Sequence, residues 1–273
     1  MICYPNAKIN LGLNVIEKRA DGFHNLESVF YPIPLADILE VVAAESDEPK
    51  IMASYSGIEI PGDKNDNLCV KAYHLLSKDF DLPAIKFHLH KIIPMGAGLG
   101  GGSADASFFI LQLNQLFSLG LSKQKMKNYA AQLGSDCTFF IDNVPSFATS
   151  RGEVLEPFEI SLKGYFLVLI NPGIHVSTKD AFAMLNPEKS KISIKSILQQ
   201  PIQTWKDNLK NDFEKTVFKK NPEIENVKNE LYSNGALYAS MTGSGSSVFA
   251  LFEKEVDLKN TFENYFYYTV LLK

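Results

Sequence analysis

Residues 7–15 alternate between apolar side chains and mostly polar ones. Apolar residues occupy every second position from Ala7 to Val15, and Lys8, Asn10 and Asn14 occupy the positions between them. Successive side chains of a β-strand point to opposite faces, so this period of two predicts a strand. We expect its apolar face in the core, and the polar groups of its other face could face a ligand.

The same patterns continue through the chain, and Asp21-Gly22 marks a turn after the first strand. Residues 46–66 mix charge, glycine and proline, and are expected to form loop with short strands. Further strands are predicted at 27–32, 37–43, 85–93, 165–171, 237–241, 248–252 and 267–271. Helices are predicted at 67–80, 103–117, 122–134, 178–185, 205–218, 222–233 and 258–265.

Length and pattern together indicate an α+β protein of two domains. A chain of 273 residues is long for one hydrophobic core, since domains commonly hold ~100–200 residues. The pattern changes after Pro157, and we predict domains at residues 1–157 and 158–273.

Composition excludes several classes of protein. A net charge of −4 does not favour a nucleic-acid binder, which needs a basic surface. Three widely spaced cysteines suit free thiols in a reducing compartment. The polar residues near the N-terminus interrupt any leader-like apolar run, and no run approaches the ~20 apolar residues of a membrane span. We therefore expect a cytoplasmic protein with no membrane or nucleic-acid partner.

The most informative segment is Pro94-Met-Gly-Ala-Gly-Leu-Gly-Gly-Gly-Ser103, which follows a predicted strand and enters a predicted helix. A bound phosphate chain needs inward-pointing backbone N–H groups and gains from the dipole at a helix N-terminus. Five glycines in seven residues allow that close approach, and Ser103 could cap the helix and offer a hydroxyl to phosphate or magnesium. The plainer interpretation is a tight turn without a ligand.

Two other phosphate-binding loops fit less well. The run beginning at Gly96 satisfies GxGxxG, but the acidic residue expected about twenty positions later in a dinucleotide site is missing. A Walker-type loop places lysine after its last glycine, whereas Ser103 follows Gly102 here. A different kind of nucleotide site is indicated.

These motifs resemble those of the GHMP-superfamily kinases, which combine a Pro-x-Gly-x-Gly-Leu-Gly-x-Ser-type loop with a late glycine-serine motif. Within that superfamily, the chain is similar to the branch that acts on a cytidine-diphosphate-linked methylerythritol. The segments that carry the resemblance are Ala7–Leu11, Arg19–His24, Pro94–Ser103, Gly134–Asp136, Asn211–Glu214 and Thr242–Ser247.

The resemblance implies a two-domain GHMP kinase fold. Its N-terminal domain would be like domain 2 of ribosomal protein S5, and its C-terminal domain would be ferredoxin-like. The implied activity is phosphorylation of the 2-hydroxyl of the methylerythritol part by ATP, with Mg²⁺ accompanying ATP, in non-mevalonate synthesis of isoprenoid precursors. The partner would be that small-molecule substrate, and the protein would be a monomer or weak homodimer.

The resemblance also implies roles for individual residues. Asp136 would accept the proton of the substrate hydroxyl, and Lys8 would orient Asp136 and stabilise negative charge. Asn10 would bind the methylerythritol part or hold Lys8. Phe23 and Phe182 would stack on cytosine, with His24 at the base edge. For Phe182, ordinary helix core is almost as good an interpretation.

The residues expected to bind ATP are Pro94, Met95, Gly96, Ala97, Gly98, Leu99, Gly100, Gly101, Gly102, Ser103, Ala104, Asn67 and Lys91. Of these, Asn67 and Lys91 would lie near adenine. No protein metal site is expected, although His88 and His90 share one strand face, because no third ligand has suitable spacing.

The sequence departs from the family pattern at a few positions. Phe23 stands where tyrosine is usual, so a hydroxyl is lost while stacking survives. Asp105 lies in the first turn of the helix expected to begin at Ser103, where it suits the dipole but would sit near phosphates. Two alternatives stay open: a related kinase for another alcohol, such as homoserine or mevalonate, and a non-catalytic nucleotide-binding regulator.

Overall fold

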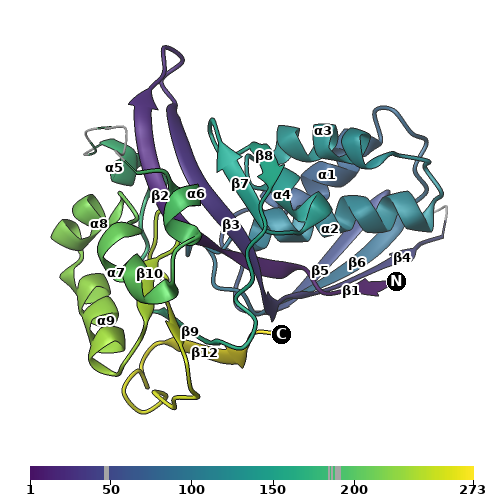
Figure 1. The fold of residues 1–273 in the computed structure, drawn as a ribbon. Helices are drawn as coiled ribbons and strands as arrows, with labels where there is room; N and C mark the ends of the chain where they lie inside the picture. Colours follow the sequence, from purple (N-terminus) through teal and green to yellow (C-terminus); the bar gives the residue numbers. More distant parts are fainter. Residues whose placement is uncertain (46–48, 184, 186, 188–191) are drawn as a thin grey trace. The chain divides into compact units, whose positions relative to one another are not determined.

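The computed structural model describes all residues except 46–48, 184, 186 and 188–191 (Figure 1). The chain forms two compact units. Unit 1 comprises residues 1–7, 35–95 and 100–144, and unit 2 comprises residues 8–34, 96–99 and 145–273. The chain passes between the units several times, whereas a single boundary at 157/158 was expected. Compactness and independent folding are different properties, so that boundary stays a prediction.

Unit 1 is a four-stranded sheet with helices packed on one face. The strand order is β1 (Ile2–Cys3), β4 (Ile38–Ala43), β6 (Ile85–Lys91) and β5 (Ile51–Gly57). β5 pairs with β6 in parallel, and the other pairs are antiparallel. The helical elements are η1 (Lys64–Asp66), α1 (Leu68–Leu76), α2 (Gly101–Leu116), α3 (Lys123–Leu133) and α4 (Cys137–Asp142).

The core of unit 1 joins the helices to the sheet. Leu39 and Leu89 from the sheet cluster with Tyr73 from α1 and with Phe109 and Leu113 from α2, and all are almost fully buried. Burying each such side chain contributes about 1.5–3 kcal/mol. This packing fixes α2, which follows the glycine-rich loop, against β6, which precedes it.

Unit 2 contains two further four-stranded sheets. One has the order β2 (Asn6–Lys18), β3 (His24–Ala36), β7 (Ser146–Thr149) and β8 (Val154–Pro157). The other is antiparallel, with the order β10 (Tyr238–Met241), β11 (Val248–Phe252), β9 (Phe166–Asn171) and β12 (Phe266–Leu271). The helical elements are α5 (Thr178–Ala183), α6 (Ile194–Leu198), η2 (Ile202–Thr204), α7 (Trp205–Asn208), α8 (Glu214–Lys220) and α9 (Pro222–Ser233).

The strongest sequence signals are confirmed. Asn67 caps α1 by accepting a hydrogen bond from the Cys69 amide, and Ser122 caps α3 in the same way from Lys125. α9 has the predicted bounds and begins at Pro222, where a missing N–H costs nothing. The predicted helix at 178–185 is shorter, and its residue 184 lies outside the described residues.

Two predicted helices are wrong. The helix expected at 205–218 is broken between α7 and α8, because this stretch pairs with β2: Leu13 donates to the Lys210 carbonyl and accepts from the Asp212 amide. Residues 258–265 form turns, with a single helix-type bond from the Phe262 amide to the Leu258 carbonyl. Tertiary pairing overrides helical periodicity in the first case.

Candidate active site

The glycine-rich loop is shaped by three left-handed glycines. Gly96, Gly98 and Gly100 have φ values of 61°, 76° and 72°, a region that other residues rarely adopt. Gly98 is also required sterically, since a Cβ there would lie 2.0 Å from the Thr242 carbonyl oxygen. The Thr242 hydroxyl donates to the Gly98 carbonyl at 3.1 Å. The late glycine-serine motif therefore supports this loop by direct backbone packing.

α2 begins earlier than the sequence suggested. Gly100 is its N-cap and the helix starts at Gly101, so Ser103 is the third helical residue and does not cap the helix. A Cβ on Gly101 would lie 2.9 Å from Ile93 Cγ2, so glycine allows the helix to start close against the end of the strand segment. The first N–H groups of a helix have no intrahelical acceptors. They form an anion-binding end, with the Ser103 hydroxyl in its first turn.

Asp136 lies beside this helix, in the same unit. It is the residue before α4, partly exposed, and its carbonyl accepts from the Phe139 amide at 3.2 Å. The Ser107 hydroxyl of α2 donates to the Cys137 carbonyl at 2.7 Å, which ties α4 to α2. Gly134 faces the Ser103 hydroxyl, 3.9 Å from an added Cβ. The fold thus brings Asp136 and the start of α2 into one neighbourhood.

Lys8 and Asn10 form a buried polar network in unit 2, with 3% and 2% of their surfaces exposed. The Lys8 ammonium donates to Asn10 Oδ1 at 2.7 Å and lies 4.8 Å from the centre of the Phe30 ring. Asn10 Oδ1 also accepts from Thr242 Oγ1 and the Gly243 amide. Its Nδ2 donates to Ser28 Oγ at 2.8 Å.

This network gives Lys8 and Asn10 of β2 partners within the protein, and their contact with a ligand stays a prediction. Of the two roles considered for Asn10, the contacts favour the second: its oxygen has three donors, so it holds Lys8 and the late motif together. Such charge-assisted hydrogen bonds are about twice as strong as neutral ones.

The segment Asn211–Glu214 connects β2 to the late glycine-serine motif within unit 2. Asn211 Nδ2 donates to the Met241 and Gly243 carbonyls at 2.7 and 2.9 Å. Asp212 accepts from the Val15 amide at 2.9 Å, so the segment also holds β2. The motif that helped to identify the family branch therefore fixes the strand that carries Lys8, through backbone contacts.

The predicted base-binding residues lie close together in unit 2. The His24 imidazole stacks on the Phe182 ring with centroids 4.7 Å apart and planes 15° apart. Phe23 is 53% exposed, and the Arg151 guanidinium lies 4.9 Å from its ring centre. Partial burial, and next the charge of Lys18, lower the pKa of His24. A neutral imidazole can both donate and accept hydrogen bonds at neutral pH.

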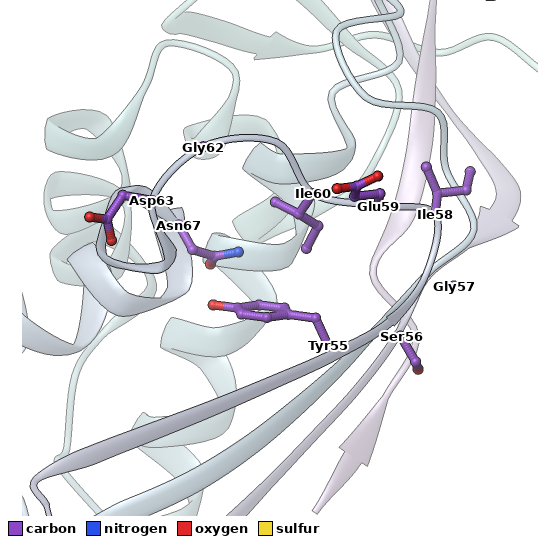
Figure 2. A pocket seen from close by; sticks show the side chains of 9 residues that line it. All are labelled: Tyr55, Ser56, Gly57, Ile58, Glu59, Ile60, Gly62, Asp63 and Asn67. Carbon is purple, nitrogen blue, oxygen red and sulfur yellow. The ribbon is translucent and has the colours of Figure 1, made fainter.

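A pocket of about 360 Å³ lies in unit 1 between β5, the loop that follows it and the start of α1. Figure 2 shows the Tyr55 ring, the Asn67 amide and the Ile60 side chain facing one another across it, while the Ser56 side chain points away. The Tyr55 hydroxyl is buried and has no hydrogen-bond partner within the structure as described. Burial raises the pKa of Tyr55 to about 12, so it is a neutral donor.

Asn67 lines this pocket, and Lys91 is not among its lining residues. The Lys91 side chain is completely buried and paired with Asp37 at 2.5 Å and Asp105 at 2.8 Å. The expectation that Lys91 lies near adenine stays a prediction, and this burial leaves its backbone as the part that can approach a ligand. Asp105 differs from expectation, since α2 starts at Gly101 and Asp105 turns inward to Lys91 in the second turn.

Sequence reasoning missed Tyr55 and Ile60, because residues 46–66 were interpreted mainly as loop. The alternation in Ile51–Gly57 was an available signal for β5. His88 and His90 are hydrogen-bonded to Ser54 and Ser56 on the neighbouring strand. Within the described part of the chain, no three His, Cys, Asp or Glu side chains cluster as a metal site, and no helix is long and apolar enough to cross a bilayer.

Two family models match the chain: the GHMP kinases N terminal domain over residues 67–151 and the GHMP kinases C terminal domain over residues 193–267. The chain is 53% identical over 274 residues to 4-diphosphocytidyl-2-C-methyl-D-erythritol kinase of Bacteroides fragilis, with both chains fully covered.

Solved structures agree with these matches. A crystal structure of 4-(cytidine 5'-diphospho)-2C-methyl-D-erythritol kinase superposes with a TM-score of 0.80 at 30% identity, covering 93% of this chain and 90% of that one. Homoserine kinase of Cytophaga hutchinsonii superposes with a TM-score of 0.62 at 18% identity, covering 98% and 94% of the two chains. The second likeness shows the fold alone.

Proposed function

The chain belongs to the GHMP kinases, in the family of 4-diphosphocytidyl-2-C-methyl-D-erythritol kinases, and we propose that it transfers the γ-phosphoryl group of ATP to the 2-hydroxyl of that cytidine compound. The oxygen of the acceptor hydroxyl forms a bond to the γ-phosphorus as the bond between that phosphorus and the β–γ bridging oxygen breaks. The hydroxyl proton passes to a base, and ADP leaves. In this family the reaction serves non-mevalonate isoprenoid synthesis.

The ATP site is proposed in unit 1. The pocket at Tyr55 suits adenine, because it combines apolar side chains with a buried hydroxyl that has no partner in the described structure and with the Asn67 amide. Asn67 Oδ1 caps α1, so its NH₂ group is the half that can serve a ligand. The phosphates would lie at the N-terminus of α2, where N–H groups and the Ser103 hydroxyl are available.

Mg²⁺ is expected to accompany ATP, held mainly by phosphate oxygens and water, as is usual for this ion in kinases. It would neutralise charge that develops on the phosphates. The protein's own contribution is electrostatic and positional. Asp136 accepts the hydroxyl proton, and the Lys8 ammonium stabilises negative charge on the transferring group.

The cytosine base is proposed to bind at Phe23, His24 and Phe182. A planar imidazole already lies flat on Phe182, so a flat base suits the same ring face. Phe23 is exposed enough to stack on a ligand. The neutral His24 ring suits hydrogen bonding to the base edge.

The observation that carries the proposal is the fixed position of Lys8. A buried ammonium held by Asn10 and placed over Phe30 is costly, since charge is withdrawn from water. A non-catalytic nucleotide binder has no need of it, whereas phosphoryl transfer needs a preorganised cation. The full-length match to curated kinases supports the same choice.

The test is ADP release from MgATP with the cytidine compound, homoserine and mevalonate as separate acceptors. We expect turnover with the cytidine compound alone, and a loss of ~10²–10⁴-fold in kcat for Asp136→Asn, the range that general-base catalysis contributes. Asp142→Asn is the matched control, because Asp142 ends α4, the short helix that Asp136 precedes, and pairs with Lys123 and Lys127. Turnover with another acceptor only would refute the substrate, and a fully active Asp136→Asn variant would refute the base.

A further inference from the structure

A cluster of three buried charges lies behind the proposed ATP site, entirely within unit 1. Asp37 precedes β4, Lys91 ends β6, and Asp105 lies in the second turn of α2. Their exposed fractions are 0%, 1% and 3%. Lys91 Nζ donates to Asp37 Oδ2 at 2.5 Å and to Asp105 Oδ2 at 2.8 Å. One cation is therefore shared by two carboxylates.

This cluster contributes little net free energy to the stability of the fold. Buried ion pairs lose their hydration, and apolar replacements of similar volume are often neutral or stabilising. Asp105 is the least well satisfied member, since its Oδ1 is buried and has no hydrogen-bond partner in the described structure. Burial raises the pKa of Asp105 to about 7. Stability alone does not account for an ionisable group at this position.

The contacts of the cluster connect both parts of the proposed nucleotide site. On the pocket side, the Lys91 carbonyl accepts from the Ile58 amide at 2.9 Å. Gly57 lies so close that a Cβ there would be 2.1 Å from the same carbonyl. Gly57 and Ile58 both line the pocket, and Figure 2 shows them at its rim. The pocket rim therefore rests on the Lys91 backbone.

On the phosphate side, Asp37 Oδ1 accepts from the Ile92 and Ile93 amides at 2.5 and 2.9 Å, just before Pro94. Asp105 connects α2 to Lys91, four residues after the first helical residue, Gly101. A Cβ on Gly101 would lie 3.4 Å from Lys91 Nζ, so the start of the helix lies directly against the cluster. The anion-binding end of α2 and the pocket rim thus share one buried anchor.

We infer that Asp105, acting through Lys91, is a positioning residue for the nucleotide: it fixes the distance between the base pocket and the phosphate-binding end of α2. A nucleoside diphosphate or triphosphate needs both places at once, and displacement of about 1 Å in a positioned site can cost ~10²-fold in activity. Adenosine lacks phosphates and needs only the pocket. The inference rests on the proposed ATP site, but not on the identity of the acceptor.

The experiment measures binding by calorimetry, without any acceptor. Asp105→Leu removes the acceptor oxygens while keeping a side chain that branches at Cγ, and we expect it to weaken MgADP binding about tenfold, which corresponds to ~1.4 kcal/mol. Asp105→Asn keeps an oxygen toward Lys91 and should recover most of the affinity. Adenosine should bind wild type and both variants equally. Gln112→Leu is the matched control, since it removes another buried, partly satisfied polar group from α2.

Thermal unfolding separates positioning from a merely structural role. The fold should remain about as stable in Asp105→Leu, because the pair of Lys91 and Asp37 is electrically balanced. Wild-type MgADP affinity in a folded Asp105→Leu variant would overturn the inference, as would equal losses for MgADP and adenosine. Should that variant not fold, Asp105→Ala decides, because it also removes the oxygens that accept from Lys91. A loss confined to MgADP then supports the inference, and unchanged binding overturns it. Normal MgADP binding without turnover of the cytidine compound would refute the proposed acceptor alone.

Discussion

Replacing Gly98 with alanine tests whether the late glycine-serine motif fixes the phosphate loop. Gly98 has a φ of 76°, where an L-residue pays roughly 1–2 kcal/mol. In addition, the new Cβ would lie 2.0 Å from the Thr242 carbonyl oxygen, whereas ordinary contacts begin near 3.4 Å. The loop and Thr242 must therefore separate by about 1.4 Å. The atoms that the new Cβ meets belong to the backbone of Thr242, so no side-chain rotation relieves the clash.

The functional loss should far exceed the loss of stability. Displacing the N–H groups that are proposed to bind phosphate by ~1 Å is expected to lower kcat/KM by about 10²-fold. Gly120→Ala is the matched control: its φ is 65°, and an added Cβ meets nothing within 4 Å. Both variants should lose free energy of unfolding from backbone strain, and Gly98→Ala should lose more because of its clash with Thr242; urea unfolding measures these losses. Only Gly98→Ala should lose activity, measured by ADP release.

The reasoning would be refuted if Gly98→Ala kept an activity within threefold of Gly120→Ala while both variants were folded. The loop would then adapt to the added methyl group without displacing its phosphate contacts.

Two further predictions concern buried charges. The pKa of Asp105 is raised to about 7 in the folded chain from an ordinary 3.8, so the folded state binds more protons between these values. The free energy of unfolding should therefore fall as pH rises from about 4 through 7, and the Asp105→Asn variant should not show this fall. Urea unfolding midpoints measured across that pH range test the prediction. Parallel pH curves for wild type and variant would contradict it. Glu214→Gln should destabilise the fold by about 2–3 kcal/mol, because Glu214 accepts from the Met241 amide and from Lys228 with little exposure. Glu230→Gln, at an exposed position on α9, should change urea stability by less than ~0.5 kcal/mol, and equal effects of the two substitutions would refute this reasoning.

Sequence reasoning succeeded where local signals carry the information. α9 combines Pro222 at its first position with apolar residues at helical spacing, and both signals are local. The glycine-rich loop was predictable because close backbone approach demands glycine whatever its neighbours are. The family resemblance then indicated Lys8 and Asp136 as a functional pair, and their roles stay proposals.

Other features depend on partners distant in the chain. Alternation places Lys91 on a strand face, but its burial depends on Asp37 and Asp105, which come from two other elements. In the same way, the break before α8 depends on pairing with Leu13. The pocket at Tyr55 is formed by a strand, a loop and a helix start, and none of these alone has a ligand-binding pattern.

The pairing of Leu13 with Asn211 has a consequence for synthesis on the ribosome. Leu13 and Val15 of β2 belong to the core that holds Val168, Phe213 and Leu231. The residue that pairs with Leu13, Asn211, is made about 200 positions later. At roughly 5–20 residues per second, that delay is about 10–40 s. Throughout this time β3 can pair with β2, but the apolar side chains of β2 remain uncovered. Nascent chains should therefore engage a general chaperone at this strand until the last third of the chain emerges.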